Sequence, residues 1–486
     1  MFRDCESLET LDLSCLNVSS ARRLGGMFEG CRSLKTADVS GWDVSNVSDM
    51  EWMFRNCENL RILDVSNWNT ASLKIASSMF YGCEKLEALD VSGWNTSSLE
   101  DMNGMFYNCK GLKTLDVSGW DTSHVTTMHT VFYGCSGVEE LDVSGWETGQ
   151  VVAMSTIFGG CSKLKKLDVS GWDTSGVSRL SGIFQECSSL EELDVSGFDT
   201  SRVTDFSGLF YGCSGLKEVD VSGFDTSRAT DLSAVFQGCA SLESLDLSGW
   251  DVSRVVHMHS LFSGCTRLKE LNTQGWNTAS LVELSTAFYD CDALVELDLS
   301  HWDVSRVVRM YGTFSKMDSL KNVNTDGWDT SSLVIMTELF YSCTSLENMD
   351  LNHWDTSRVT GIDGIFHECS KLRSLQIGNW DTSRVLTMNC TFRNCCALES
   401  LDVSGWDTSR VVLMPGTFES CASLQELDLS GWNDDRLRNM GSMFRSCTNL
   451  RRLDLRGWQS REFIKNVQYG SLGNNCPNLR EVLVAF

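Results

Sequence analysis

The stretch CSSLEELDVSGFDTSRVTDFSGLFYG, residues 187–212, is one unit of a repeat that continues along almost the whole chain of 486 residues. Cysteine, phenylalanine and tryptophan each recur every 26 residues, in three series that keep their phase without insertion or deletion. Met317 takes one place in the cysteine series, and Phe198 and Phe224 take two places in the tryptophan series. A strict period within about 20–29 residues is typical of leucine-rich repeats, so we predict one array and not several domains.

The first half of each unit predicts a short strand. Leu190, Leu193 and Val195 follow the L-x-x-L-x-L spacing. The polar Asp194 between two apolar residues is typical of a strand with one buried face. Copies in register predict a parallel sheet that advances by about 4.8 Å per coil.

The second half of each unit predicts interrupted helix. Val203, Phe206 and Phe210 are spaced as on one helical face, Asp199 is a good N-cap residue, and Gly212 supplies a stop. Helices need more room than strands, so the array should curve. We therefore expect an α/β solenoid, a leucine-rich-repeat-like curved array of about 18 coils of 26 residues. Its parallel β-sheet would lie on the concave side, with short helical turns on the convex side.

Residues 1–458 are predicted to form a single repeat solenoid with no N-terminal cap, since Phe2 is already in repeat phase. After Trp458 the phase slips by three. Residues 459–486 are predicted to form an irregular terminal repeat that acts as a C-terminal cap, with a terminal strand around Val482 and Leu483. No signal peptide or anchor is apparent in this chain.

The motif LDVSGWDTSxVxxMxxxFxxC is nearly complete from Leu115 to Cys135 and returns in successive coils at one spacing. It resembles the BspA-like leucine-rich repeat, the bacterial surface protein repeat family, over residues 1 to about 458. The resemblance implies an extracellular or cell-surface protein linked to adhesion. It implies little about the ligand, because members of that family resemble each other better in fold than in ligand.

The aromatic and cysteine series are predicted to form the core, with Phe210, Trp120 and Cys213 as examples. Buried free thiols, disulfides between consecutive coils and a metal site are the three interpretations of the cysteines. No C-x-x-C pair is present, and stacked coils hold equivalent residues about 4.8 Å apart, farther than disulfide geometry prefers. These points favour free thiols.

A series of aspartates is the clearest candidate binding surface. Fifteen of eighteen coils carry Asp between the two inward strand residues, so the side chains should project from the concave face. Stacked carboxylates repel, and either hydrogen bonds to neighbouring Ser, bound Ca²⁺ or a basic partner could offset this repulsion. The candidate binding residues are Asp90, Asp116, Asp142, Asp168, Asp194, Asp220 and Asp246.

The regular pattern breaks most between residues 270 and 380, where we place a candidate specificity patch: Asn272, Gln274, Asn324, Asp326 and Gln376. A separate series of arginines stands three residues after the capping Asp or Asn. Pairing with that Asp across a first helical turn and an anion-binding stripe are its two interpretations. The series comprises Arg202, Arg228, Arg254, Arg306, Arg358, Arg384, Arg410 and Arg436.

The composition narrows the function. With 40 Lys and Arg against 65 Asp and Glu, the net charge is −25, which argues against nucleic acid as a partner. No apolar run is long enough for membrane insertion, and no enzyme or cofactor motif is visible. We expect a non-enzymatic protein-interaction scaffold, an adhesin-type protein that binds host or cell-surface proteins through its acidic concave face. The alternatives are a structural spacer or stalk and a calcium-dependent binding module.

Overall fold

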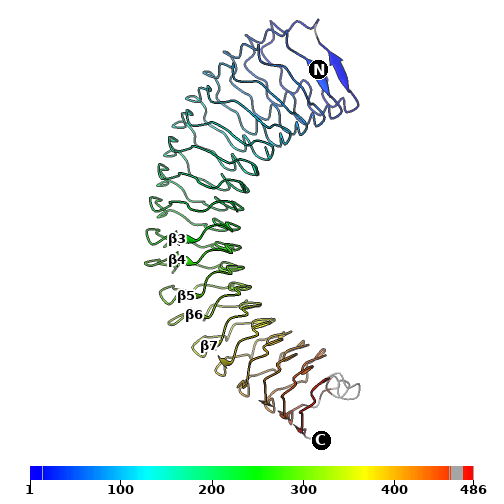
Figure 1. Ribbon diagram of the computed structural model, residues 1–486, viewed down its shortest axis with the longest axis vertical. Coiled ribbons are helices and arrows are strands. Elements are labelled where there is room, and N and C mark those ends of the chain that lie inside the picture. Colours follow the sequence, from blue (N-terminus) through cyan, green and yellow to red (C-terminus); the bar gives the residue numbers. More distant parts are fainter. Residues whose placement is uncertain (14, 459, 461–462, 464–473, 485–486) are drawn as a thin grey trace. The chain divides into compact units, whose positions relative to one another are not determined.

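The computed structural model describes residues 1–13, 15–458, 460, 463 and 474–484, and it comprises two compact units, Met1–Asp251 (unit 1) and Val252–Phe486 (unit 2). Each unit is a parallel β-solenoid of 26-residue coils, and the chain makes about 18 coils (Figure 1). Neighbouring coils pair at an offset of one repeat, as Leu11 does with Ala37 in unit 1 and Leu297 with Val323 in unit 2. The predicted period and parallel register are confirmed.

The strands are three residues long and form one row in each unit. In unit 1 they are β1 (Thr10–Asp12), β2 (Thr36–Asp38) and β3 (Ser244–Asp246). Single parallel bridges continue the row over part of the distance between β2 and β3, as from Thr114 to Glu140. In unit 2 they are β4 (Glu270–Asn272), β5 (Glu296–Asp298), β6 (Asn322–Asn324), β7 (Asn348–Asp350), β8 (Ser374–Gln376), β9 (Glu426–Asp428), β10 (Arg452–Asp454) and β11 (Glu481–Leu483).

Stacked aromatic rings fill the core of both units. Phe210 is fully buried, and its ring centroid lies 5.9 Å from that of Phe184 and 5.6 Å from that of Phe236. Trp120 is buried between two further indoles, and its Nε1 donates to the carbonyl of Val91 in the preceding coil. Each coil therefore completes its core only with its neighbours.

The expectation of short helical turns is wrong for the described part of residues 1–458, because turns occupy the second half of each coil. Gly208 and Gly212 both have a left-handed backbone, with φ of 63° and 71°. The N–H groups of Leu209 and Tyr211 close tight turns within the coil, whereas that of Phe210 donates to the next coil at 2.9 Å. An α-helix directs every such N–H along its own axis, so bonds to the next coil exclude it.

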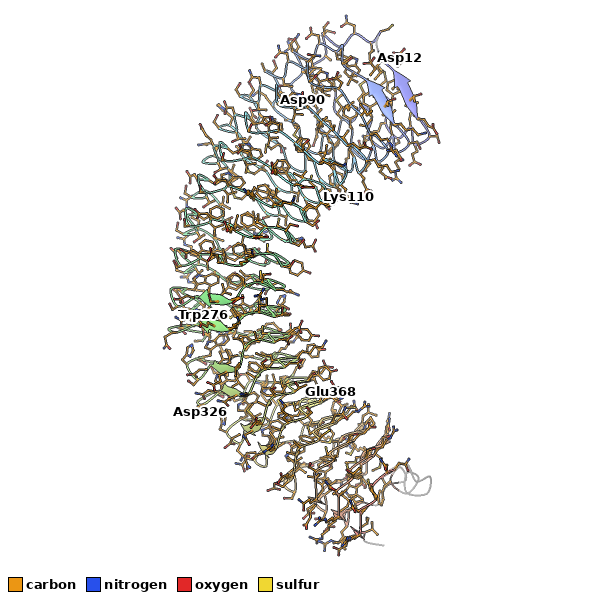
Figure 2. The ribbon with its side chains drawn as sticks, in the orientation of Figure 1. Asp12, Asp90, Lys110, Trp276, Asp326 and Glu368 are labelled. Atoms are coloured by element: carbon orange, nitrogen blue, oxygen red, sulfur yellow. The ribbon has the colours of Figure 1, made fainter. Side chains whose placement is uncertain are left out.

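A left-handed residue recurs at these two positions in every coil, and many of them are not glycine, for example Thr130 and Asn108. This turn row and the strand row are both joined from coil to coil by backbone hydrogen bonds. In unit 2, Asp326 beside the strand row and Glu368 in the turn row lie at opposite edges of the solenoid (Figure 2). The prediction of a concave sheet assumed that helices hold the coils apart on the opposite side, and turns stand there instead. We call the surface formed by the outward side chains of the strand row the strand face.

The end of the array follows the predicted slip in phase. In β11, Val482 pairs in parallel with Leu453 of β10, an offset three residues longer than the repeat. The predicted terminal strand is therefore confirmed. The capping role of residues 459–486 remains a prediction, and much of that segment lies outside the described residues.

Candidate interaction surface

The strand-face aspartates are held by their own turns. Oδ1 of Asp194 accepts hydrogen bonds from the backbone N–H of Ser196 at 3.0 Å and from its hydroxyl at 2.7 Å. The same pair of bonds recurs along unit 1, at Asp90, Asp142 and Asp168. The predicted hydrogen bonds from the neighbouring serine, which can offset the repulsion between the carboxylates, are confirmed.

These hydrogen bonds also favour the charged form of the carboxylates. The bonds from Ser196 lower the pKa of Asp194 below its usual value, and the opposing effect of the Asp220 charge is the smallest contribution. The pKa of Asp142 is lowered in the same way by Ser144. At Asp142 and Asp194, hydrogen bonding therefore outweighs the repulsion between neighbouring rungs.

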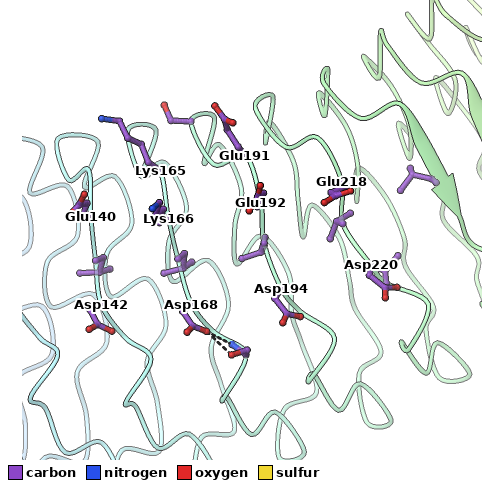
Figure 3. A pocket seen from close by; sticks show the side chains of 18 of the residues that line it. Glu140, Asp142, Lys165, Lys166, Asp168, Glu191, Glu192, Asp194, Glu218 and Asp220 are labelled. Carbon is purple, nitrogen blue, oxygen red and sulfur yellow. Dashed lines mark hydrogen bonds between the residues drawn. The ribbon is translucent and has the colours of Figure 1, made fainter.

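Two rows of charged side chains run side by side on this face (Figure 3). Glu140, Lys166, Glu192 and Glu218 form one row, and the aspartates two residues later form the other. The residue between them points into the core, as Leu193 does. Equivalent residues of neighbouring coils should lie about 4.8 Å apart along each row.

A shallow open trough follows these rows across unit 1, from Thr114 to Asp246. Ten carboxylates and two amines line it, so its formal charge is strongly negative. One of the two amines, Lys165, is already paired with Glu139 at 2.7 Å. The trough brings together six of the seven predicted binding residues: Asp116, Asp142, Asp168, Asp194, Asp220 and Asp246. The seventh, Asp90, precedes the trough by one coil.

Sequence reasoning missed a third row, one residue before the glutamates. Its charges alternate in sign from Glu87 to Lys269 at the repeat spacing. Opposite charges pair between coils, as Lys35 does with Glu9 and Lys217 with Glu191. The alternation is visible in the sequence at intervals of 26 residues. These pairs neutralise the border of the strand face, so the unbalanced charge is concentrated on the two inner rows.

The predicted specificity patch lies in unit 2, outside the trough. The side-chain oxygens of Asn272 and Asn324 accept from the N–H groups of Gln274 and Asp326, both at 3.1 Å. Gln376 occupies the same strand position in β8. The patch residues stand on alternate coils, about 9.6 Å apart along the row, so the structure does not gather them into one cluster.

The irregular coils around this patch have a packing cause. Thr273 replaces a buried valine, and the indole N–H of Trp302 donates to its hydroxyl at 3.3 Å, not to a main-chain carbonyl. The ring of His301 lies 2.9 Å from the Thr273 carbonyl oxygen. His353 and Thr325 repeat this arrangement two coils later. Thr273 with His301, and Thr325 with His353, are therefore two copies of the same variant, and each copy spans two neighbouring coils.

The cysteine series consists of free thiols in the described residues. Cys213 is fully buried, and its thiol donates to the carbonyl of Phe184 at 3.0 Å. Burial raises the pKa of this thiol to about 12, so it stays protonated. Cys5 is the exposed member of the series, and Cys15 and Cys396, which stand outside the series, are exposed as well.

The capping aspartates behave differently from the prediction. Oδ1 of Asp199 accepts from the N–H of Ser201 at 2.9 Å, but a turn follows and not a helix. Among the described residues, no carboxylate lies within ion-pair distance of Arg202 or of the equivalent arginines. The predicted contact between Asp and Arg is therefore wrong. Arg202 contributes only a minor electrostatic effect that lowers the pKa of Asp199, after the bonds from Ser201.

Within the described ranges, no group of three or more His, Cys, Asp or Glu side chains is placed to hold a metal ion. No helix among these residues is long and apolar enough to cross a membrane.

The family described as "Mycoplasma protein of unknown function, DUF285" matches residues 1–115, 111–193, 180–296, 282–376 and 362–470. The chain belongs to this family. No curated protein matches the chain. The DUF285 chain carries the leucine-rich-repeat spacing seen at Leu190, Leu193 and Val195, and the narrower BspA-like resemblance remains a prediction.

Solved structures with similarity to the DUF285 chain include a leucine-rich repeat protein from Bacteroides ovatus. It is 16% identical, 74% of this chain and 87% of that chain are covered, and the TM-score is 0.33. A leucine rich cell surface protein from Faecalibacterium prausnitzii is 16% identical, with 78% and 84% covered and a TM-score of 0.34. The functional domain of InlJ from Listeria monocytogenes, which includes a cysteine ladder, is 15% identical, with 86% and 71% covered and a TM-score of 0.22.

Proposed function

We propose that this chain is a non-enzymatic protein-interaction scaffold that binds a basic protein segment along the acidic strand face of unit 1. The single observation that carries the proposal is the trough lined by ten carboxylates and two amines on consecutive coils. Because serine hydrogen bonds hold the aspartates in place, little side-chain freedom is lost when a partner binds.

The mechanism is summation of weak contacts. Each rung offers one or two exposed carboxylates, and an exposed ion pair contributes only about 0–1 kcal/mol. Several rungs acting on one partner add avidity, and the summed field accelerates encounter with a basic surface. Binding should therefore weaken steeply as salt is added.

The narrower role follows from the BspA-like resemblance. We propose an adhesin-type protein at the cell surface, with host or cell-surface proteins as partners. The basic segments of such partners would meet the trough. This role is separable from the binding chemistry, because the trough can be tested with a defined peptide.

The test is the affinity of a lysine- and arginine-rich peptide for the purified chain at low and high salt. Three aspartates are changed to asparagine together: Asp168, Asp194 and Asp220. Asparagine keeps the turn, as Asn272 and Asn324 show. We expect at least a ~10-fold loss of affinity at low salt.

A matched control makes the same change of charge on the strand face of unit 2, at Asp298, Asp350 and Asp402. These aspartates accept the same backbone hydrogen bond, from Ser300, Asn352 and Ser404. The control variant should bind within about twofold of the unchanged chain, because its carboxylates lie outside the trough. An equal loss in both variants would overturn the assignment to unit 1.

The alternatives predict other outcomes. If the chain is a calcium-dependent module, Ca²⁺ should raise its melting temperature, and a chelator should bring the melting temperature back to its original value. A spacer or stalk would bind neither the peptide nor a panel of extracellular proteins at any salt concentration.

A further inference from the structure

Charge is distributed unevenly between the two units. Residues 1–251 contain 18 Lys and Arg against 37 Asp and Glu, a net charge of −19. Residues 252–486 contain 22 against 28, a net charge of −6. Unit 2 also carries an edge with no counterpart of the same composition in unit 1.

A row of exposed arginines marks this edge. They stand at one position of the repeat, and the four at Arg358, Arg384, Arg410 and Arg436 lie on consecutive coils. Among the described residues, none of the four has a carboxylate within ion-pair distance. The Asp or Asn three residues earlier is held by its own turn, as Asp407 is by the N–H of Ser409 at 2.8 Å.

Aliphatic residues stand beside the arginines, two residues later in most coils, with Thr360 and Arg438 in that place after Arg358 and Arg436. One inward residue separates the two, as buried Val411 separates Arg410 from Val412, so both rows face outward. Leu386 is 44% exposed. The aliphatic row consists of Val256, Val282, Val308, Val334, Leu386 and Val412.

Backbone hydrogen bonds fix the spacing of this edge. The N–H of Val412 donates to the carbonyl of Leu386 at 2.8 Å, and that of Val334 to Val308 at 3.0 Å. The same position in unit 1 is mostly polar or charged, as at Ser48, Lys74 and Glu100. Unit 2 therefore presents a row of arginines with aliphatic side chains beside some of them, at the coil pitch of about 4.8 Å.

The occupant that matches the arginines must offer carboxylates at the same pitch. The trough of unit 1 does so, because its carboxylate rows recur once per coil. An extended peptide advances about 3.3 Å per residue and falls out of step with the coils. A second copy of this chain stays in step at every rung.

We infer that the arginine–aliphatic edge of unit 2 binds the acidic trough of unit 1 in a second copy of the chain. This inference rests on the proposed function, since it names a partner for the same trough. Because the two surfaces differ, the contact is heterologous and each copy keeps one free surface of each kind. Chains should therefore associate head to tail, at a salt concentration that screens their net negative charge to a distance of about 8 Å.

The experiment is sedimentation velocity of the full chain over a concentration series in about 0.15 M salt. The arginine variant changes Arg384, Arg410 and Arg436 to serine, the residue that Ser280 and Ser332 place at this position. The trough variant is Asp168→Asn/Asp194→Asn/Asp220→Asn. We expect the unchanged chain to form larger species as concentration rises, and each variant alone to stay monomeric.

Mixing the two variants supplies the decisive result. Each retains one intact surface, so an equimolar mixture should form a one-to-one complex and nothing longer. The control variant Lys321→Ser/Lys371→Ser/Arg373→Ser removes the same charge at exposed sites elsewhere in unit 2 and should associate like the unchanged chain.

Three results would overturn the inference: a monomeric unchanged chain at all concentrations, an arginine variant that still self-associates, or a mixture without a complex. A monomeric chain that still binds the basic peptide at its trough would leave the proposed function standing. Loss of peptide binding in the arginine variant would count against both.

Discussion

Unit 1 and unit 2 end their strands with the same turn, but aspartate stands at its first position in every coil of unit 1 and only in some coils of unit 2. In unit 1 aspartate closes the turn. At Asp194, for example, Oδ1 accepts a hydrogen bond from the backbone N–H of Ser196 at 3.0 Å. In unit 2 Asn272 and Asn324 close it with an amide oxygen at 3.1 Å. The turn thus needs an acceptor oxygen and not a charge, so the carboxylates of the trough exceed what the fold requires.

The largest expected effect concerns what the two units share. Phe210 in unit 1 and Phe366 in unit 2 are both fully buried in ring stacks, so alanine at either position leaves a cavity. Each change should cost about 3–5 kcal/mol of unfolding free energy. Guanidinium-induced unfolding measures both, and a much smaller cost at one position would show that the cores differ as well as the surfaces.

A smaller effect of opposite sign tests the turn row. Thr130 in unit 1 and Thr286 in unit 2 both have φ of 53°, in the left-handed region that β-branched residues avoid. Glycine at either position should stabilise the chain by up to about 1 kcal/mol. In a helix the same change would destabilise the chain by about 0.3 kcal/mol, so the sign of the shift in melting temperature distinguishes the two structures.

Substitutions at Asp142 test whether the turn needs a hydrogen-bond acceptor or a negative charge. Asparagine there keeps an acceptor for the N–H of Ser144 and should leave the unfolding midpoint unchanged, whereas alanine removes the acceptor and should lower it. Thermal unfolding of the two variants is the measurement. A midpoint lowered equally by asparagine would mean that the charge itself maintains the turn.

The mildest expected effect is a difference in acid sensitivity. The folded-state pKa of Asp64, Asp90, Asp142 and Asp220 is lowered by serine hydrogen bonds, so this stabilisation is present above about pH 4 and is lost as pH falls through the folded pKa. Amide exchange at the strand row of unit 1 should accelerate before that at Asn272 and Asn324, whose turns do not titrate. Simultaneous acceleration would contradict this difference.

Much of the architecture could be predicted from the sequence, because the period of 26 residues fixes which residues stack. The inward Leu193 and the outward Asp194 follow from alternation alone. The predicted helix failed because Phe206 and Phe210 can both point inward from consecutive turns, so helical spacing did not require a helix. Gly208 and Gly212, four residues apart, were the available signal for two left-handed positions.

The candidate site was predictable in part. The outward aspartates could be located, but which coils form the trough depends on side chains from three rows, and pairs such as Lys165 with Glu139 decide where charge remains unbalanced. The contact predicted between Asp199 and Arg202 failed because the aspartate is committed to the N–H of Ser201. Spacing along the sequence cannot rank these competing partners.

Hydrogen–deuterium exchange with and without the lysine- and arginine-rich peptide tests the central claim most directly. Slowed exchange is expected in segments that cover the trough, residues 140–144, 166–170, 192–196 and 218–222, whose serine amides lie beside the carboxylates. The equivalent segments of unit 2, residues 296–300 and 348–352, should not change. Protection confined to unit 2, with the peptide bound, would contradict the account.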